Sequence, residues 1–93
     1  MSVTHAIVLI EVERDAMPTF GGTLADLEGV QEAWSVTGDW DFVAIVRVGR
    51  HEMLADVITG QVLQLPGVSR TQTMVAFEAF SRHDLDAMFS VGG

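Results

Sequence analysis

The sequence contains no cysteine and no lysine. Without cysteine, disulfides, thiolate nucleophiles and cysteine-based metal sites are excluded. Binding to a phosphate backbone needs clustered basic side chains. The arginines here are instead scattered, so neither nucleic acid nor an anionic membrane surface is an expected partner. They stand at Arg14, Arg47, Arg50, Arg70 and Arg82.

Long hydrophobic runs are also missing. Residues 1–5 have no basic start, and the apolar run at 6–10 is too short for a signal peptide or a membrane span. We therefore expect a protein that is not exported and that resides in the cytoplasm.

What the sequence does contain is apolar and acidic. Of its 93 residues, 48% are hydrophobic, and 13 acidic against 5 basic side chains give a formal net charge of −8. That length predicts one domain, covering residues 1–93, with a core of modest size. So much apolar content in so small a chain indicates that part of its surface is shared with a partner.

The sequence contains an internal repeat of a strand, a helix, a Leu-x-Gly-Val turn and a second strand. The segment LEGV at 27–30 recurs as LPGV at 65–68, each time between a helix-like and a strand-like stretch. Gly29 and Gly67 stand where a helix should stop, because glycine tolerates the left-handed backbone of a helix cap.

Apolar periodicity predicts four strands, at 4–12, 30–37, 42–48 and 68–77, with a hairpin turn at Gly38-Asp39. It predicts helices at 15–28, irregular at first because of Pro18, Gly21 and Gly22, and at 51–65. A short tail helix is expected at 83–89. The order βαββαβ is the α+β, ferredoxin-like arrangement with an antiparallel four-stranded sheet. Two helices on one face leave the other face open, and an apolar open face requires a second subunit, as in a dimeric α/β barrel.

Two segments resemble the Lrp/AsnC family effector domain, also called the RAM domain. Residues 35–44, SVTGDWDFVA, are similar to its V-T-G-x-aromatic-D-hydrophobic hairpin, and residues 65–73, LPGVSRTQT, to its L-P-G-V-x-x-T-x-T segment. The resemblance covers essentially the whole chain in order and spacing. Most members carry an N-terminal helix-turn-helix domain. Because the first residues here lead into the first strand, we expect the stand-alone form, with no DNA-reading part of its own.

The resemblance implies dimers that assemble further, commonly into an octamer, and effectors, usually amino acids, bound in clefts between dimers. It places the hairpin turn, a helix carboxylate and two strand threonines at that cleft. The ligand-binding residues expected on this basis are Thr37, Gly38, Asp39, Trp40, Asp56, Thr71 and Thr73.

The chemistry of these residues suits a zwitterion. A turn at Gly38 lets backbone N–H groups approach a carboxylate, and Asp56 can accept a charge-assisted hydrogen bond from an ammonium. Thr71 and Thr73 alternate along a strand and so share a face, while Trp40 offers an apolar wall.

Each residue also has a structural interpretation. Gly38 closes the hairpin in any case, Asp39 suits a solvated turn, and Asp41 suits acceptance of turn amides, which we favour over binding. Trp40 fits interface packing as well as it fits a pocket wall, and Trp34 fits the core or an interface better than the site. Asp56 fits an exposed helix position, and the two threonines are good strand formers.

Three functions remain open. The first is an amino-acid-binding regulator that is not an enzyme and acts on transcription or metabolism indirectly. The second is a small cofactor-independent monooxygenase or isomerase, with His5, His51 or His83 beside a carboxylate. The third is a subunit that co-assembles with a full-length Lrp-like regulator. No cofactor is expected, and the histidines lack the spacing of metal ligands.

Overall fold

The computed structural model describes residues 3–78 and residue 80. No helix in this part of the chain is long and apolar enough to cross a membrane. The predicted tail helix at 83–89 lies outside the described residues. The elements, in chain order, are β1 (Thr4–Val12), the 3-10 turn η1 (Arg14–Ala16), α1 (Met17–Ala25), β2 (Val30–Ser35), β3 (Phe42–Val48), α2 (Met53–Ile58), the 3-10 turn η2 (Val62–Gln64) and β4 (Val68–Val75).

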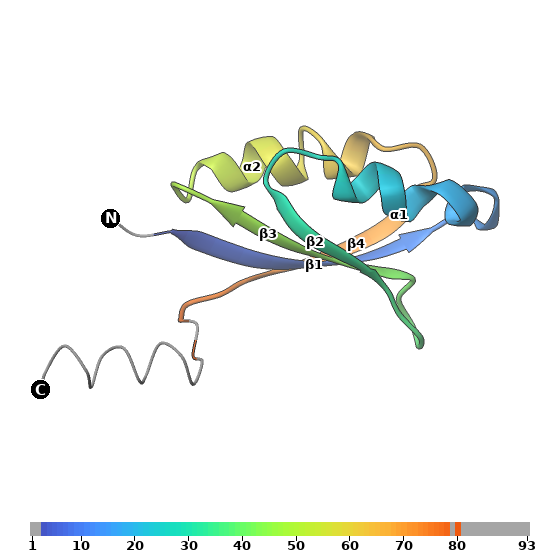
Figure 1. Cartoon of the computed structure of the whole chain (residues 1–93), viewed down its shortest axis with the longest axis horizontal. Helices are drawn as coiled ribbons and strands as arrows, with labels where there is room; N and C mark the ends of the chain where they lie inside the picture. Colours follow the sequence, from blue (N-terminus) through green and yellow to red (C-terminus); the bar gives the residue numbers. More distant parts are fainter. Residues whose placement is uncertain (1–2, 79, 81–93) are drawn as a thin grey trace, which may run out of the picture.

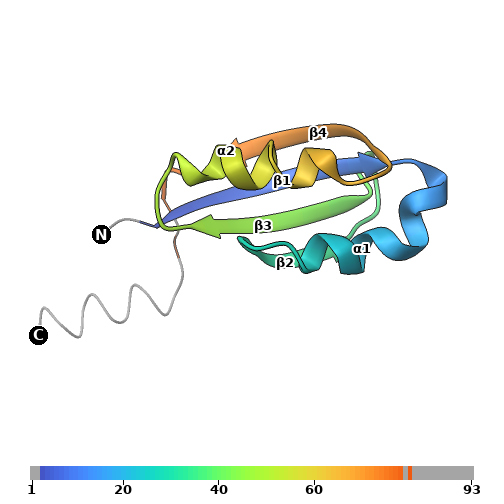
Figure 2. The ribbon, with the colours of Figure 1, turned by 90° about the horizontal axis from the view of Figure 1, so that it is seen from above.

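The four strands form one antiparallel sheet in the order β2-β3-β1-β4. Both helices lie on one face of it, and no other helix or strand within residues 3–78 covers the other face (Figure 1). Seen from above, α1 lies on the β2 side of the sheet and α2 lies nearer β4 (Figure 2). The ferredoxin-like α+β fold predicted from the element order is therefore confirmed.

The core lies between the sheet and the helices because alternate strand residues point to opposite faces. On β1 the helix-facing residues are Ala6, Val8, Ile10 and Val12, and all are buried. The helices contribute their own buried residues, and the ring of Phe20 from α1 lies 5.1 Å from that of Phe42 on β3. The remaining buried residues are Leu24, Ala44, Val46, Val48, Leu54, Val57 and Val62.

The two glycines of the sequence repeat occupy equivalent conformations. Gly29 and Gly67 each have φ of 93°, a region that L side chains rarely adopt. Both are also tightly packed. A Cβ at Gly29 would meet the side chain of Val57, and a Cβ at Gly67 would meet that of Ala16. The predicted chain reversals therefore carry a close packing contact as well as a turn.

The second predicted helix was too long. It was expected to run without a break over 51–65, but α2 ends at Ile58, and η2 follows after a break. At the break the Gly60 N–H donates to the Ala55 carbonyl, and Gln61 leaves helical geometry with φ −122° and ψ −59°. A Cβ at Gly60 would lie 2.5 Å from the Asp56 carbonyl oxygen. The apolar face nevertheless continues across the break, because Leu54, Val57 and Val62 are all buried.

Other predicted boundaries shift by a few residues. β2 ends at Ser35 and β4 at Val75, each two residues early, although the Ala76 N–H still bonds to the His5 carbonyl. The first helix, predicted over 15–28, ends at Ala25, and its irregular part is the 3-10 turn η1, so Pro18, Gly21 and Gly22 lie inside the α-helix and do not disrupt it. The α-helix then contains Pro18, which is tolerated in a first turn because its missing N–H would have no partner there.

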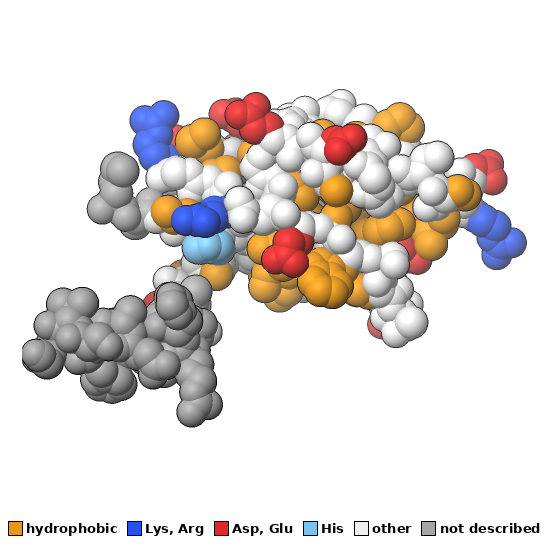
Figure 3. Space-filling view, in the orientation of Figure 1, with side chains coloured by type: hydrophobic (Ala, Val, Ile, Leu, Met, Phe, Trp, Pro, Cys, Tyr) orange, Lys and Arg blue, Asp and Glu red, His pale blue; other side chains and the backbone are white. Residues whose placement is uncertain are grey.

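The uncovered face of the sheet is apolar at its centre. Within the chain, Trp34 is 57% exposed and Met74 is 41% exposed, while their neighbours on β1 and β3 are half-buried. Hydrophobic side chains gather along the sheet, below the helices, in the space-filling view (Figure 3). We call this surface the open face. Its apolar members are Ile7, Leu9, Trp34, Val43, Ile45 and Met74.

Candidate functional site

The loop that joins β2 to β3, residues 36–41, forms the turn predicted from the sequence. Gly38 has φ of 107°, and no atom lies within 4 Å of the position its Cβ would take. The loop is closed by a hydrogen bond of 3.0 Å from the Val36 N–H to the Asp41 carbonyl. Glycine is therefore needed here for its conformation, and the space beside it is open.

Asp41 holds this loop to the end of β1. Its carboxylate accepts a hydrogen bond of 2.9 Å from the Val12 N–H, and its own N–H donates to the Ile10 carbonyl at 3.0 Å. The pairing of β1 with β4 shifts register between Glu11 and Val12, so the Val12 amide needs an acceptor outside the regular ladder. This supports a structural role for Asp41, although the amide it accepts from belongs to β1 and not to the turn.

Trp40 makes a contact that sequence reasoning missed. The guanidinium carbon of Arg70 lies 4.1 Å from the centroid of the Trp40 ring, a cation–π distance. The same guanidinium approaches the Glu11 carboxylate, with Nη2 3.5 Å from Oε2. Glu11 and Arg70 are cross-strand partners on β1 and β4. The hairpin, the end of β1 and the start of β4 therefore meet at one point.

Thr71 and Thr73 do share one face of β4, as predicted. They pair with Ile10 and Val8, which are core residues, so both point toward the helix side of the sheet. Thr73 lines a hollow of about 330 Å³ between α2 and the edge strand β4. Two hydroxyls, an imidazole, a carboxylate and an apolar floor surround this hollow. Its lining consists of His51, Glu52, Leu54, Ala55, Ile58, Thr59, Thr73 and Val75.

Asp56 lies in a different hollow. It is exposed on α2 and lines a space of about 320 Å³ that also includes the Glu28–Gly29 turn and the end of β3. Arg47 contributes to the same lining, and its N–H donates to the Gly29 carbonyl at 2.9 Å. Asp56 and Thr73 are therefore separated within one chain, each in its own hollow.

The expected ligand-binding residues thus fall into three groups. Residues 37–40 lie at the hairpin, beside the end of β1. Asp56 lies near Arg47, which pairs with His5 at the start of β1. Thr71 and Thr73 form the third group, on β4. Figure 1 shows the hairpin and α2 at opposite ends of the sheet. One chain does not bring the groups together, so the single cleft remains a prediction that requires contact between chains.

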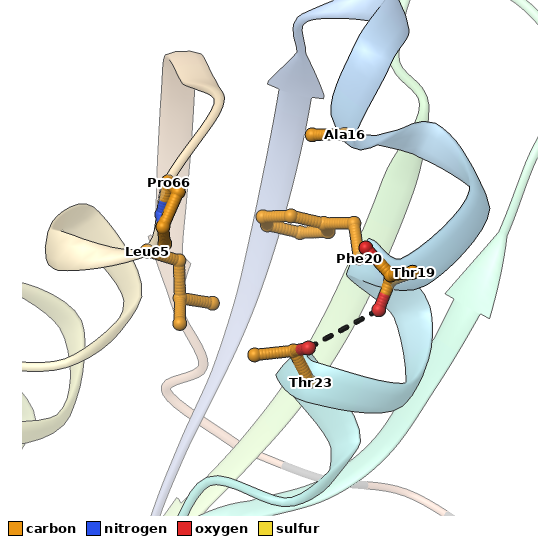
Figure 4. A pocket seen from close by; sticks show the side chains of 6 residues that line it. All are labelled: Ala16, Thr19, Phe20, Thr23, Leu65 and Pro66. Atoms are coloured by element: carbon orange, nitrogen blue, oxygen red, sulfur yellow. Dashed lines mark hydrogen bonds between the residues drawn. The ribbon is translucent and has the colours of Figure 1, made fainter.

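A further hollow, of about 250 Å³, lies between α1 and the turn before β4. Figure 4 shows the Phe20 ring pointing from α1 toward Leu65, with Thr19 and Thr23 along the helix. The Thr23 hydroxyl donates to the Thr19 carbonyl at 3.1 Å. This lining is mostly apolar and carries no charged group. It therefore offers no counter-charge for either end of an amino acid.

The histidines give little support to catalysis. His51 and Glu52 do line one hollow together, but both are exposed, and Glu52 is also paired with Arg50 at 3.6 Å. His5 is half-buried on the open face opposite Arg47. His83 lies outside the described residues.

Comparison with known proteins identifies the family. The profile of the Lrp/AsnC ligand binding domain matches residues 5–85. This chain belongs to that family.

Its relatives in the Lrp/AsnC family are transcriptional regulators. It is 32% identical to an uncharacterized HTH-type transcriptional regulator of Pyrococcus furiosus, over 80% of this chain and 51% of the relative. It is also 32% identical to the leucine-responsive regulatory protein of Haemophilus influenzae, over 77% of this chain and 43% of the relative. The chain thus spans about half the length of the curated relatives it matches.

Solved structures show the same Lrp/AsnC fold. TTHA0845 from Thermus thermophilus is 43% identical with a TM-score of 0.79, and the match covers 85% of this chain and 99% of that one. AsnC of E. coli has a TM-score of 0.77 at 18% identity, over 85% of this chain and 54% of that one.

In this Lrp/AsnC domain, the sequence motifs predicted one partner of the Trp40–Arg70 contact, and only the folded structure shows the other. The hairpin motif predicted Trp40 as a binding residue, and the structure places its ring against Arg70. Arg70 lies between motif positions, and its proximity to Trp40 depends on the register of β4 against β1. Only its place directly before Thr71, on the other face of the same strand, could have drawn attention to it.

Proposed function

We propose that this Lrp/AsnC domain binds a free amino acid at a cleft completed by a second dimer, and that occupancy changes its assembly. Through assembly, the domain acts indirectly on transcription or metabolism. The observation that carries the proposal is the hairpin loop. It presents open space at Gly38 and stands beside an aromatic ring and a fixed guanidinium, in a chain that belongs to a ligand-binding family.

Assembly is supported by the open face. Val43 on β3 pairs with Trp34 on β2 and with Leu9 on β1, so one apolar row crosses three strands. A second row runs from Ile45 through Ile7 to Met74. Two such sheets packed face to face would remove these side chains from water, each contributing about 25 cal/mol per Å² of apolar area buried. A homodimer through the open face follows, and further association would bring hairpins and α2 helices of different dimers together.

The ligand class is supported by the groups that would then meet. The turn at Gly38 supplies backbone N–H groups for a carboxylate, and Asp56 supplies an exposed carboxylate for an ammonium. The Thr71 and Thr73 hydroxyls are additional partners for either group. One related fold does hold an amino acid: NMB0573 of Neisseria meningitidis was solved as an L-Met complex, with a TM-score of 0.75 at 15% identity. That likeness concerns the fold alone.

The direct test is isothermal titration of the purified protein with each of the twenty standard amino acids, after removal of bound metabolites. We expect at least one to bind, with a change in oligomer mass measured by light scattering on occupancy. A folded protein that binds none of them would refute the amino-acid proposal.

The assignment of Asp56 is tested by Asp56→Ala. The substitution should weaken binding about tenfold to a hundredfold, because a hydrogen bond between charged groups is worth about 1.5–3 kcal/mol. Asp26→Ala is the matched control, since Asp26 is an exposed carboxylate at the end of the other helix. If the two variants bind equally well, Asp56 does not contact the ammonium.

A further inference from the structure

Arg70 is an arginine held in place on an acidic protein. The formal net charge is −8, so most of the surface repels a carboxylate. Arg70 is nevertheless positioned at two points, over the Trp40 ring at 4.1 Å and against Glu11 at 3.5 Å. A side chain restrained at two points loses less conformational entropy when it binds a third group.

The contact with Glu11 does not occupy the guanidinium fully. At 3.5 Å it is longer than the roughly 2.7–2.9 Å of a charge-assisted hydrogen bond, so it is a loose ion pair. Among the residues that the structure describes, no other acceptor is recorded for Arg70. A guanidinium has five N–H donors, and the side chain is 55% exposed. Several donors are therefore available to a ligand.

The position of Arg70 connects it to the proposed cleft. Its side chain lies on the same side of the sheet as Glu11, opposite to that of Thr71, and its guanidinium meets Trp40, two positions after Gly38. Two acidic residues flank Trp40: Asp41 is engaged by the Val12 N–H, whereas Asp39 is exposed in the turn. The guanidinium is thus the basic group that the structure holds against this hairpin.

We propose that Arg70 binds the carboxylate of the amino acid, with Trp40 and Glu11 orienting its guanidinium toward the hairpin turn. This inference rests on the proposed function and assigns the carboxylate end of the site to a side chain at a variable position of the 65–73 segment. The planar fork of arginine matches the two oxygens of a carboxylate, so the site selects free acids over their amides and over the corresponding amines.

The test compares three forms of one molecule. The amino acid that binds most tightly in the titration is measured again as its α-carboxamide and as its decarboxylated amine. We expect the wild-type protein to bind the acid at least about tenfold more tightly than the amide, since a charged hydrogen-bonded pair is lost. If the amide binds as tightly as the acid, the proposal is overturned without any variant.

Arg70→Gln should abolish that preference, lowering affinity for the acid about tenfold to a hundredfold and leaving the amide nearly unchanged. Arg50→Gln is the matched control because it removes the same charge from another exposed arginine–glutamate pair, and it should retain the preference. Arg70→Lys keeps the charge and loses the fork, so an intermediate preference is expected. It replaces Arg70→Gln if that variant does not fold.

The outcomes separate the two proposals. Binding of no amino acid by the wild-type protein would refute both. Two other results would overturn the role of Arg70 alone, provided that the wild-type protein binds an amino acid. In the first, folded Arg70→Gln keeps the preference for the acid; in the second, Arg50→Gln loses that preference to the same extent as Arg70→Gln.

Discussion

Replacing Gly29 with alanine should destabilise this domain through two separable effects. The first is conformational, because φ at Gly29 is 93° and a residue with a Cβ is strained there by about 1–2 kcal/mol. The second is steric. The new Cβ would lie 2.7 Å from Cγ2 and 3.3 Å from Cγ1 of Val57, and Val57 is a buried core residue on α2. Overpacking of this kind costs about 1–3 kcal/mol.

Gly38→Ala provides the matched control. Gly38 has a similar φ, 107°, but no atom lies within 4 Å of its Cβ position. Gly38→Ala should therefore show the conformational cost alone, about 1–2 kcal/mol, whereas Gly29→Ala should lose about 2–5 kcal/mol. Since a small domain has only about 5–15 kcal/mol of stability, the difference is readily measured.

The assay is urea unfolding followed by circular dichroism, at one protein concentration because association contributes to apparent stability. Val57→Ala combined with Gly29→Ala should cost less than the sum of the single losses, by at least about 0.5 kcal/mol, since the clash is removed. Equal losses at Gly29 and Gly38, or a simple sum in the double variant, would refute the steric argument.

Two further predictions concern the hairpin and the open face. Asp41→Ala should lower the free energy of unfolding by about 1–3 kcal/mol, because the Val12 N–H loses its acceptor, and Asp39→Ala in the same loop should change it by less than about 0.5 kcal/mol. Urea unfolding checks this, and equal effects would contradict the structural role of Asp41. Trp34→Glu should reduce the oligomer mass measured by light scattering, because it replaces the most exposed apolar side chain of the open face with a charge. Met17→Glu, an equally charged change at an exposed residue of α1, should not. An unchanged mass for Trp34→Glu would argue against assembly through this surface.

The parts of the fold that sequence reasoning predicted are those governed by local periodicity. β1 and β3 show strong apolar runs, and their observed bounds agree with the predicted ones. The second helix was predicted too long because its apolar spacing continues through Gly60 and Gln61. Apolar periodicity predicts which residues face the core, and Val62 does face it. It does not predict that the backbone leaves α-helical geometry between Ile58 and Val62.

The same distinction applies to the candidate site. The hairpin motif indicated Gly38 and Trp40, and the family resemblance implied Asp56. They could not show that Asp56 and Thr73 line separate hollows, or that Asp41 is engaged by Val12, because these facts depend on side-chain direction and strand register. The single cleft stays a prediction that a dimer-of-dimers structure would test.

By itself, the sequence determined the family, the order of strands and helices, the two glycine turns and the acidic, lysine-free surface. Each of these depends on residue type and on spacing along the chain. Only the tertiary structure decided that Arg70 stands over Trp40 and beside Glu11, because residues 30 and 59 positions apart meet only when the hairpin folds against β1 and β4. Register and distance between strands are properties of the folded sheet, and the proposed carboxylate site arises from them.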